Sequence, residues 1–283
     1  MVLFGTQLYP TTADAFRRQQ RAVSTLIDRS PLPPINLQFS DRRDVCEVDG
    51  CETVAILELD SNRITGRSGP RKPIVSELFT RLAELAVERH IRYFGFSNAD
   101  ILFTSAAIDR ILCADHPAFL IARTDVDADG NLNPEPLLYG TDVFVVDASW
   151  WLAHQRRFRP YILGEGCWDN VYAAQLLSIA GGLLLNREPL VRHEAHPTTW
   201  HDSPFAEHNG YLAALDRMYF TRWVTYATRL EAIRRDARGL GASDDELLLQ
   251  EEIFRNWKPG LSDRLIQALR VAKLEARRRF RRS

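Results

Sequence analysis

The chain has 283 residues, of which 45% are hydrophobic and 26% are charged, and its formal net charge is −1. This composition is typical of a globular protein with room for one large domain or two, and it excludes a disordered chain. A net charge so close to zero gives no reason to expect nucleic acid as a partner.

Three further features bound the class of protein. The opening residues, MVLFGTQLYP, have no basic leader ahead of an apolar core, so we expect no signal peptide. No run of about 18 apolar residues occurs, so we expect no segment to span a membrane. The cysteines match no zinc or disulfide spacing. We expect reduced thiols in a cytoplasmic protein, although Cys46 and Cys51 could pair if oxidised.

The first hundred residues alternate between apolar runs typical of strands and amphipathic runs typical of helices. Thr12 is a candidate cap for the first of these helices. Such an alternation predicts a mainly parallel sheet with helices on both faces. The predicted strands are 2–9, 35–41, 52–60 and 93–97, and the predicted helices are 12–29 and 73–90.

Three of these strands end at or near an aspartate, namely Asp41, Asp60 and Asp100. In parallel sheets, ligands bind beyond the carboxyl ends of the strands, so these side chains are candidates for a shared site. Each could instead cap a turn or lie on the surface. Asp100 lies between two apolar runs, where an unpaired charge would cost several kcal/mol. We therefore interpret it as a ligand for magnesium or manganese bound through a substrate's phosphates.

The second half of the chain is less regular. Strands are predicted at 118–124 and 141–150, and a helix is predicted to begin near residue 168. A further strand from 183 runs into a loop rich in histidine. From about residue 204 the pattern is helical, and Ser243 with Glu246 forms a candidate capping box.

The segment DVDADG at 125–130 matches the start of an EF-hand calcium loop. The match fails further on, because position twelve is Pro136 and the preceding residues are typical of a strand rather than a helix. We interpret the segment as a polar hairpin turn, with adventitious calcium binding as the alternative.

Two other segments carry groups suited to chemistry. In GEGCWDN, at 164–170, Asp169 lies at a predicted helix start, where it could cap the helix or act as a general base. In RHEAHPTTWH, His193, His196 and His201 follow Arg192. Their spacing fits neither HExxH nor a zinc finger, so we expect an imidazole on a cation or a phosphate rather than a zinc centre.

These pieces occur in the order seen in nucleotide-diphospho-sugar transferases of the GT-A type. SNAD, at 97–100, stands where that family has its DxD motif, GEGCWDN where it has an acceptor-side acid, and the late histidines where many members bind metal. Over roughly residues 1–210 the chain resembles bacterial glycosyltransferase-like proteins of this type. The resemblance implies a three-layer α/β/α fold with a mainly parallel central sheet in residues 1–203, and a helical C-terminal extension in residues 204–283.

The resemblance also implies a function. The protein would move a sugar from a nucleotide-diphosphate donor to a hydroxyl acceptor, in the synthesis of a bacterial surface polysaccharide or glycolipid. A magnesium or manganese ion would lie on Asp100 with His193 or His196, and Asp169 or Glu165 would be the catalytic base. One departure weakens the case for a metal, because Asn98 stands where the first acid of the motif is expected. The donor would be bound by Asp41, Asn98, Asp100, Arg123 and Arg192.

The last residues, 261–283, form a predicted helix with an arginine-rich end. Such tails are usually solvated, but this one could also hold the protein on an anionic membrane surface, since each basic side chain adds about 1 kcal/mol there. The acceptor could then be a saccharide or a lipid-linked molecule, and the protein would be cytoplasmic and peripheral to the inner face of the membrane. RNA binding by the tail is a weaker alternative.

Two other functions remain open. A binding or scaffold protein could keep the sheet without catalysis, and Asn98 favours this alternative. A nucleotidyltransferase would use a similar sheet but would carry a glycine-rich loop with a basic residue after the first strand. The segment GTQLYPTTADAF at 5–16 has one glycine and no lysine, so this second alternative is weaker.

Overall fold

The computed structural model describes residues 1–113, 115–127, 130–132, 140–185, 188–195, 203–236, 244–256, 269 and 271–274. Its centre is a seven-stranded sheet with the strand order β3-β2-β1-β4-β8-β6-β9. All of these strands are parallel except β8, which runs antiparallel to both β4 and β6. The strands are β1 (Val2–Thr6), β2 (Ile35–Phe39), β3 (Glu52–Leu57), β4 (Tyr93–Ser97), β6 (Ala118–Ala122), β8 (Thr141–Asp147) and β9 (Leu183–Leu185).

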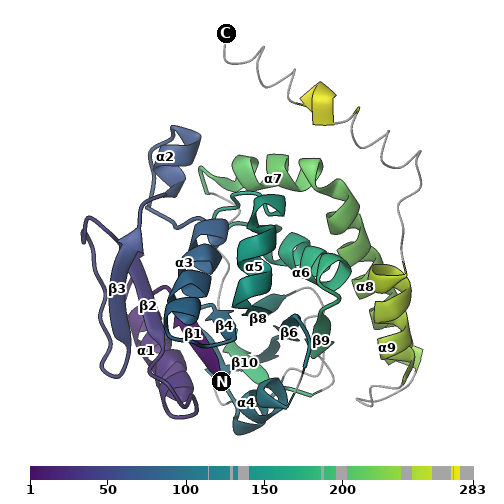
Figure 1. Ribbon diagram of the computed structural model, residues 1–283, viewed down its shortest axis with the longest axis horizontal. Coiled ribbons are helices and arrows are strands. Elements are labelled where there is room, and N and C mark those ends of the chain that lie inside the picture. Colours follow the sequence, from purple (N-terminus) through teal and green to yellow (C-terminus); the bar gives the residue numbers. More distant parts are fainter. Residues whose placement is uncertain are drawn as a thin grey trace.

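Helices cover both faces of this sheet (Figure 1). Side chains of α3, α5, α6 and α8 pack with one face in the larger core cluster, and those of α1 and α4 pack with the other face. The helices are α1 (Ala13–Ile27), α2 (Ser61–Thr65), α3 (Val75–Glu88), α4 (Ser105–Leu112), α5 (Ala148–His154), α6 (Trp168–Ile179), α7 (Ala206–Leu215), α8 (Arg217–Asp236) and α9 (Asp244–Gln250), with the 3-10 turn η1 (Gln155–Arg157) and the π-helical turn η3 (Glu251–Arg255).

The predicted fold class is therefore confirmed: a mainly parallel sheet lies between layers of helices, and helices follow toward the C-terminus. Thr12 caps α1, because its side chain accepts a hydrogen bond from the backbone N–H of Ala15. Several strands end earlier than predicted, since the strand at 2–9 ends at Thr6 and the strand at 52–60 ends at Leu57. The strand predicted at 141–150 ends at Asp147, whose carboxylate accepts from the N–H of Trp150 and so begins α5. The candidate cap Ser243 and most of 261–283 lie outside the described residues.

A second, three-stranded sheet has the order β5-β10-β7, with the bounds β5 (Ile101–Phe103), β7 (Thr124–Val126) and β10 (Val191–Glu194). β10 is antiparallel to β5 and parallel to β7. In this register His193 lies beside Ile101 on one side and beside Asp125 on the other. The small sheet thus brings the histidine next to the turn that joins β4 to β5.

The C-terminal helices share the core that covers the sheet, since Leu212, Trp223 and Tyr226 belong to the larger core cluster. A residue from this part of the chain also covers the β9 edge of the sheet. The side chain of Gln250 accepts from the N–H of Leu184 and donates to its carbonyl, at 3.1 and 3.2 Å. The division into residues 1–203 and 204–283 stays a prediction. Of the described helices, none is long and apolar enough to cross a membrane.

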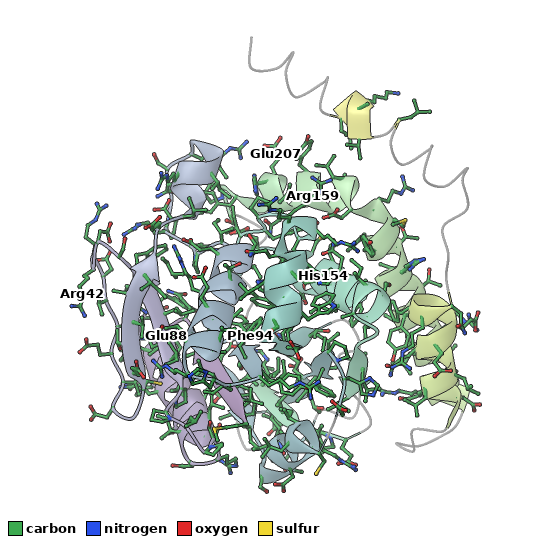
Figure 2. The ribbon with its side chains drawn as sticks, viewed as in Figure 1. Arg42, Glu88, Phe94, His154, Arg159 and Glu207 are labelled. Carbon is green, nitrogen blue, oxygen red and sulfur yellow. The ribbon has the colours of Figure 1, made fainter. Side chains whose placement is uncertain are left out.

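Phe79 of α3 is the centre of the aromatic core above the sheet. Its ring is fully buried and lies 5.1 to 5.7 Å, between centroids, from five other aromatic rings. One of these is Phe94 of β4, which Figure 2 labels in the middle of the molecule. Edge-on contacts of this kind add to the free energy of apolar burial. The other four rings belong to Phe96, Phe144, Trp151 and Tyr172.

We expect Phe79→Ala to lower the free energy of unfolding by about 3–5 kcal/mol, because it leaves a cavity among these rings. Urea denaturation followed by circular dichroism measures the change. Val87→Ala is a matched control on the same helix, since Val87 is 44% exposed. It should change the free energy of unfolding by less than about 0.5 kcal/mol. Similar losses in both variants would contradict the central place of Phe79.

Candidate active site

The candidate site lies at the edge of the large sheet where β1, β2, β4 and β6 end and where the antiparallel β8 begins. Parallel α/β sheets bind ligands outside this edge. Two groups of side chains gather there. One is a cluster of acids with a histidine and an arginine, and the other lines a cavity beside the ends of β1 and β2.

The acidic cluster is built around His193, which is only 4% exposed. Its Nε2 lies 3.4 Å from Oδ2 of Asp100, and its Nδ1 lies 2.9 Å from Oδ1 of Asp125. Burial alone would lower the pKa of His193, but the hydrogen bonds to Asp100 and Asp125 outweigh it and raise the pKa to about 9. At neutral pH this imidazole is therefore a cation held between two carboxylates.

Asp142, at the start of β8, forms the floor of the same cluster and is 4% exposed. Its Oδ1 accepts a hydrogen bond of 2.6 Å from the side-chain amide of Asn98. The guanidinium of Arg123 lies 3.5 Å from this carboxylate and 3.2 Å from that of Asp125. Burial raises the pKa of Asp142 and the charge of Arg123 opposes the rise. The structure thus joins Asn98 and Arg123 through a carboxylate that the sequence analysis did not select.

Asp169 lies in the first turn of α6, and Cys167 just before the helix has a left-handed backbone with φ 76°. The backbone N–H groups of Asn170 and Thr141 donate to its carboxylate, so it faces the start of β8. Burial, followed by repulsion from Asp142, raises the pKa of Asp169 to about 7. A carboxyl group with this pKa can take up and release a proton near neutral pH, as a general base must.

The cavity has a volume of about 660 Å³, and Tyr9 is one of the residues that line it. Burial, and then the charge of Asp100, raises the pKa of Tyr9, which places this phenol near the acidic cluster. The lining combines amide side chains, aromatic rings and positive charges, and its members include Gln7, Tyr9, Gln38, Phe39, Arg43, Arg71, Lys72 and Gly164.

Asp41 pairs with Arg43 and Arg71, which line this cavity, rather than with residues of the acidic cluster. Hydrogen bonds from Arg71 and Arg43 lower the pKa of Asp41 to about 2, so it is ionised at neutral pH. Arg71 also lies over the ring of Phe39, with 4.1 Å from its guanidinium carbon to the ring centroid. Asp60 is the N-cap of α2, accepting from the N–H of Arg63 at 2.8 Å, and it too binds Arg71. The predicted third strand ends at Leu57, before this aspartate.

The remaining predicted residues are placed as follows. Glu165 is buried away from the acidic cluster and pairs with Lys72. Arg192 lies on the face of β10 opposite His193, because neighbouring strand residues alternate and Glu194, on the same face as Arg192, binds Arg21 of α1. His196 and His201 lie outside the described residues. The structure therefore brings Asn98, Asp100, Arg123, Asp169 and His193 to one place.

The segment predicted to be a polar hairpin turn contributes one residue to the site. Asp125 belongs to β7, where it binds His193. The turn itself begins later: the N–H of Asn131 donates to Asp127 at 2.8 Å, and Val126 and Leu132 form an antiparallel bridge. Asp129 and Pro136, which decided the comparison with a calcium loop, lie outside the described residues.

The residues fit a cation only in a limited way. Among the described residues, no group of three histidine, cysteine or acidic side chains could hold a metal ion. The 3.4 Å between Nε2 of His193 and Oδ2 of Asp100 is, however, short enough for both to bind one ion. Magnesium and manganese often take one or two protein ligands and complete their shell with phosphate oxygens and water. These two side chains fit that kind of site when His193 is neutral, because a ring nitrogen that carries a proton cannot bind a metal ion.

Comparison with known proteins finds solved structures that are similar to this chain, but no similar sequence. No protein-family model and no curated protein matches the sequence. Among solved structures, the chain is similar to a Desulfovibrio desulfuricans G20 protein provisionally described as a nucleotide-diphospho-sugar transferase (11% identity, TM-score 0.43, covering 77% of this chain and 97% of that one). It is also similar to residues 1–349 of S. aureus TarS in complex with UDP-GlcNAc (10% identity, TM-score 0.47, covering 89% and 79%). At these values the argument for a function has to come from the site.

We expect Asp169→Asn to make the protein more stable, increasingly so as pH rises from 4 toward 7. The unfolded chain loses this proton near the usual pKa of 3.8, whereas the folded protein keeps it until about pH 7. Above pH 4 the unfolded chain is therefore stabilised by losing a proton that the folded protein retains, and asparagine removes this penalty, roughly 1–3 kcal/mol by pH 8.

Urea denaturation of both proteins at pH 5, 6, 7 and 8 measures this difference. Asp109→Asn, which removes an exposed carboxylate on α4, is the control for a change of one surface charge. A stability difference between Asp169→Asn and the parent protein that stays the same across this range would contradict the raised pKa.

Proposed function

We propose that the protein is a glycosyltransferase that moves a sugar from a nucleotide-diphosphate donor to a hydroxyl acceptor. The observation that carries this proposal is the meeting of two unlike regions at one sheet edge. A cavity of about 660 Å³ with amides and rings suits a nucleoside, and the adjoining cluster holds a cationic His193, Arg123 and a carboxyl group of neutral pKa. Sugar transfer from a nucleotide donor needs these parts side by side.

The leaving group would be stabilised by positive charge. When the bond between the sugar and the phosphate breaks, the nucleoside diphosphate gains negative charge, and fixed cations in a partly buried site stabilise it. His193 and Arg123 supply such charges, and both are held in place by carboxylates. A magnesium or manganese ion on Asp100 would add further positive charge at the phosphates when it is bound, and His193 could join Asp100 as a ligand only after losing its proton, since a metal-ligating imidazole is neutral. Asn98 would contribute by contact with the donor, since its amide is already fixed by Asp142.

Asp169 would accept the proton of the acceptor hydroxyl. Its pKa of about 7 leaves it ionised in a large fraction of molecules at neutral pH. The acceptor is a saccharide or a lipid-linked molecule in this proposal, as in bacterial surface polysaccharide or glycolipid synthesis. The basic residues near the C-terminus would hold the protein on the inner face of the membrane, in the cytoplasm.

One alternative has a specific observation in its favour. Asn98 occupies a position where an acid would strengthen cation binding, and its hydrogen bond to Asp142 occupies one of its polar groups. A protein that binds a nucleotide sugar without transferring the sugar would tolerate this change. We keep this binding or scaffold function as the second candidate.

A thermal-shift screen tests donor binding. We expect UDP, GDP, ADP, CDP or dTDP to raise the melting temperature by at least about 2 °C, most strongly with manganese present, because ligands that bind only the folded state stabilise it. Asp100→Ala should abolish the manganese-dependent part of the shift, whereas the control Asp109→Ala should keep it. If none of the diphosphates shifts the melting temperature, with or without manganese, the proposed function is wrong.

Release of the nucleoside diphosphate from its sugar donor, to an acceptor or to water, tests catalysis. We expect kcat/KM to rise with pH up to about 7 and then to level off, as Asp169 loses its proton. Asp169→Asn should lower kcat about 10²–10⁴-fold, as is usual for loss of a general base. Donor affinity should stay nearly unchanged. Donor binding without any release of diphosphate would favour the binding or scaffold function instead.

A further inference from the structure

Lys72 and Glu165 form an ion pair in the wall of the cavity, outside the acidic cluster. Nζ of Lys72 lies 2.6 Å from Oε1 of Glu165. The side chain of the glutamate is fully buried, with 0% exposed, while that of the lysine is 27% exposed and lines the cavity. The ammonium group of Lys72 therefore faces the cavity, whereas the carboxylate of Glu165 is buried beneath it.

Glu165 is poorly placed to act as a base. Its Oε1 accepts from both Lys72 and Ser203, the latter at 2.5 Å. Its Oε2 is buried and has no hydrogen-bond partner among the residues that the structure describes. A carboxylate with no exposed surface cannot reach an acceptor hydroxyl in the cleft. Removing its partner would instead leave a buried charge uncompensated, which is strongly unfavourable.

Both segments that carry the pair are fixed by other contacts. Lys72 donates its backbone N–H to the hydroxyl of Ser61 at 3.1 Å, and its carbonyl accepts from the N–H of the same serine at 2.8 Å. On the other segment, the side chain of Asn209 binds the backbone of Ile162 and the carbonyl of Gly166. Ser61 thus fixes the backbone of Lys72, and Asn209 fixes the backbone on either side of Glu165.

A contact to α7 fixes the chain just before Lys72. Arg67 donates to the carbonyl of Pro204 at 2.7 Å and also pairs with Glu207, which Figure 2 labels on α7. Together with the contacts of Ser61, this keeps the stretch from 67 to 72 in one position against the C-terminal helices. The ammonium group is therefore presented by a rigid part of the protein, as a binding group must be.

Gly164 lies beside the ammonium group of Lys72. This glycine has φ +72°, and a Cβ built on it would lie 3.9 Å from Nζ of Lys72. An ammonium group has three N–H donors, and only one is used by Glu165 within the described part of the chain. The described residues therefore leave the other donors available to a ligand in the cavity.

The lining of the cavity comes from two parts of the chain. At the ends of β1 and β2, the side-chain nitrogens of Gln7 and Gln38 donate to the carbonyl of Leu8, and Arg71 lies over the ring of Phe39. Lys72 and Gly164 also line the cavity, and Gly164 is followed by Glu165 and the start of α6, where Asp169 lies. A compact ammonium charge on the side that leads to the reacting groups suits a phosphate.

We propose that Lys72 binds the diphosphate of the nucleotide donor, and that Glu165 is its positioning residue rather than the catalytic base. This inference rests on the proposed function, because it assigns one more contact in the same donor site. It replaces a role in proton transfer for Glu165 with a role in donor affinity, and the two roles can be separated by measurement.

Isothermal titration calorimetry tests the role of Lys72. The ligand is whichever of UDP, GDP, ADP, CDP and dTDP binds the parent protein most tightly, compared with its own nucleoside. We expect Lys72→Met to weaken binding of the diphosphate at least about 10-fold, the usual effect of losing a charge-assisted hydrogen bond. Binding of the nucleoside should change less than about 3-fold. Arg63→Met, which removes an exposed positive charge on the neighbouring α2, is the matched control and should change neither.

Two controls keep this test decisive. Lys72→Met leaves a buried carboxylate unpaired, so the double variant Lys72→Met/Glu165→Gln, which removes that charge, is measured beside it and should show the same selective loss. Equal weakening of nucleoside and diphosphate would assign Lys72 to the base and overturn the proposal, as would unchanged binding of the diphosphate. A parent protein that binds no nucleoside diphosphate would instead refute the proposed function itself.

Steady-state kinetics tests the role of Glu165. We expect Glu165→Gln to raise the KM for the donor about 3–10-fold and to leave kcat at saturating donor within about 3-fold of the parent value. Loss of a positioning residue weakens binding, whereas loss of a base slows the chemical step. If the substitution instead lowers kcat by about two orders of magnitude or more and leaves KM unchanged, Glu165 is catalytic and its assignment as a positioning residue is wrong.

Discussion

The site depends on one charged hydrogen-bond chain, in which the imidazolium of His193 lies between Asp100 and Asp125. Each of these side chains comes from a different strand of the small sheet or from the turn beside it, so the chain of contacts also fixes β5, β10 and β7. Two carboxylates at this depth would repel each other if the histidine were neutral. Their attraction for the proton keeps the imidazole charged, and the charge in turn keeps the carboxylates together.

The same balance extends to the rest of the sheet edge. Four carboxylates meet there, those of Asp100, Asp125, Asp142 and Asp169, and His193 and Arg123 are cations that contact them. Burial, and then the charge of Asp142, raises the pKa of Asp169. Several cations line the neighbouring cavity, and two of them, Arg71 and Lys72, pair with carboxylates. In the proposed function, the negative group is the diphosphate of the nucleotide sugar, and the group that loses a proton is the hydroxyl of the acceptor.

Sequence alone could locate Asp100 and Asp169, because one follows a strong apolar run and the other stands at a helix start. His193 was selected through the histidine-rich segment and the family resemblance, and the structure places it in β10 rather than in the expected loop. Sequence alone could not locate Asp142, because this residue reaches the site only if β8 is antiparallel to its neighbours. The sequence of a single strand does not show whether it pairs in parallel or antiparallel. Asp125 was hidden in a turn-like segment whose register with β10 is a long-range property. Lys72 and Glu165 are 93 residues apart, and no local pattern links them.

The side-chain amide of Gln250 matters beyond the site. It donates to and accepts from the backbone of Leu184, as a neighbouring strand would. The outward-facing N–H and carbonyl of Leu184 are therefore hydrogen-bonded although β9 is the last strand of the sheet. Exposed edge strands can recruit strands from other molecules. A form of the protein cut off before α9 would lose this substitute and offer an open strand to its neighbours, so self-association into fibrous or amorphous material would be its characteristic failure.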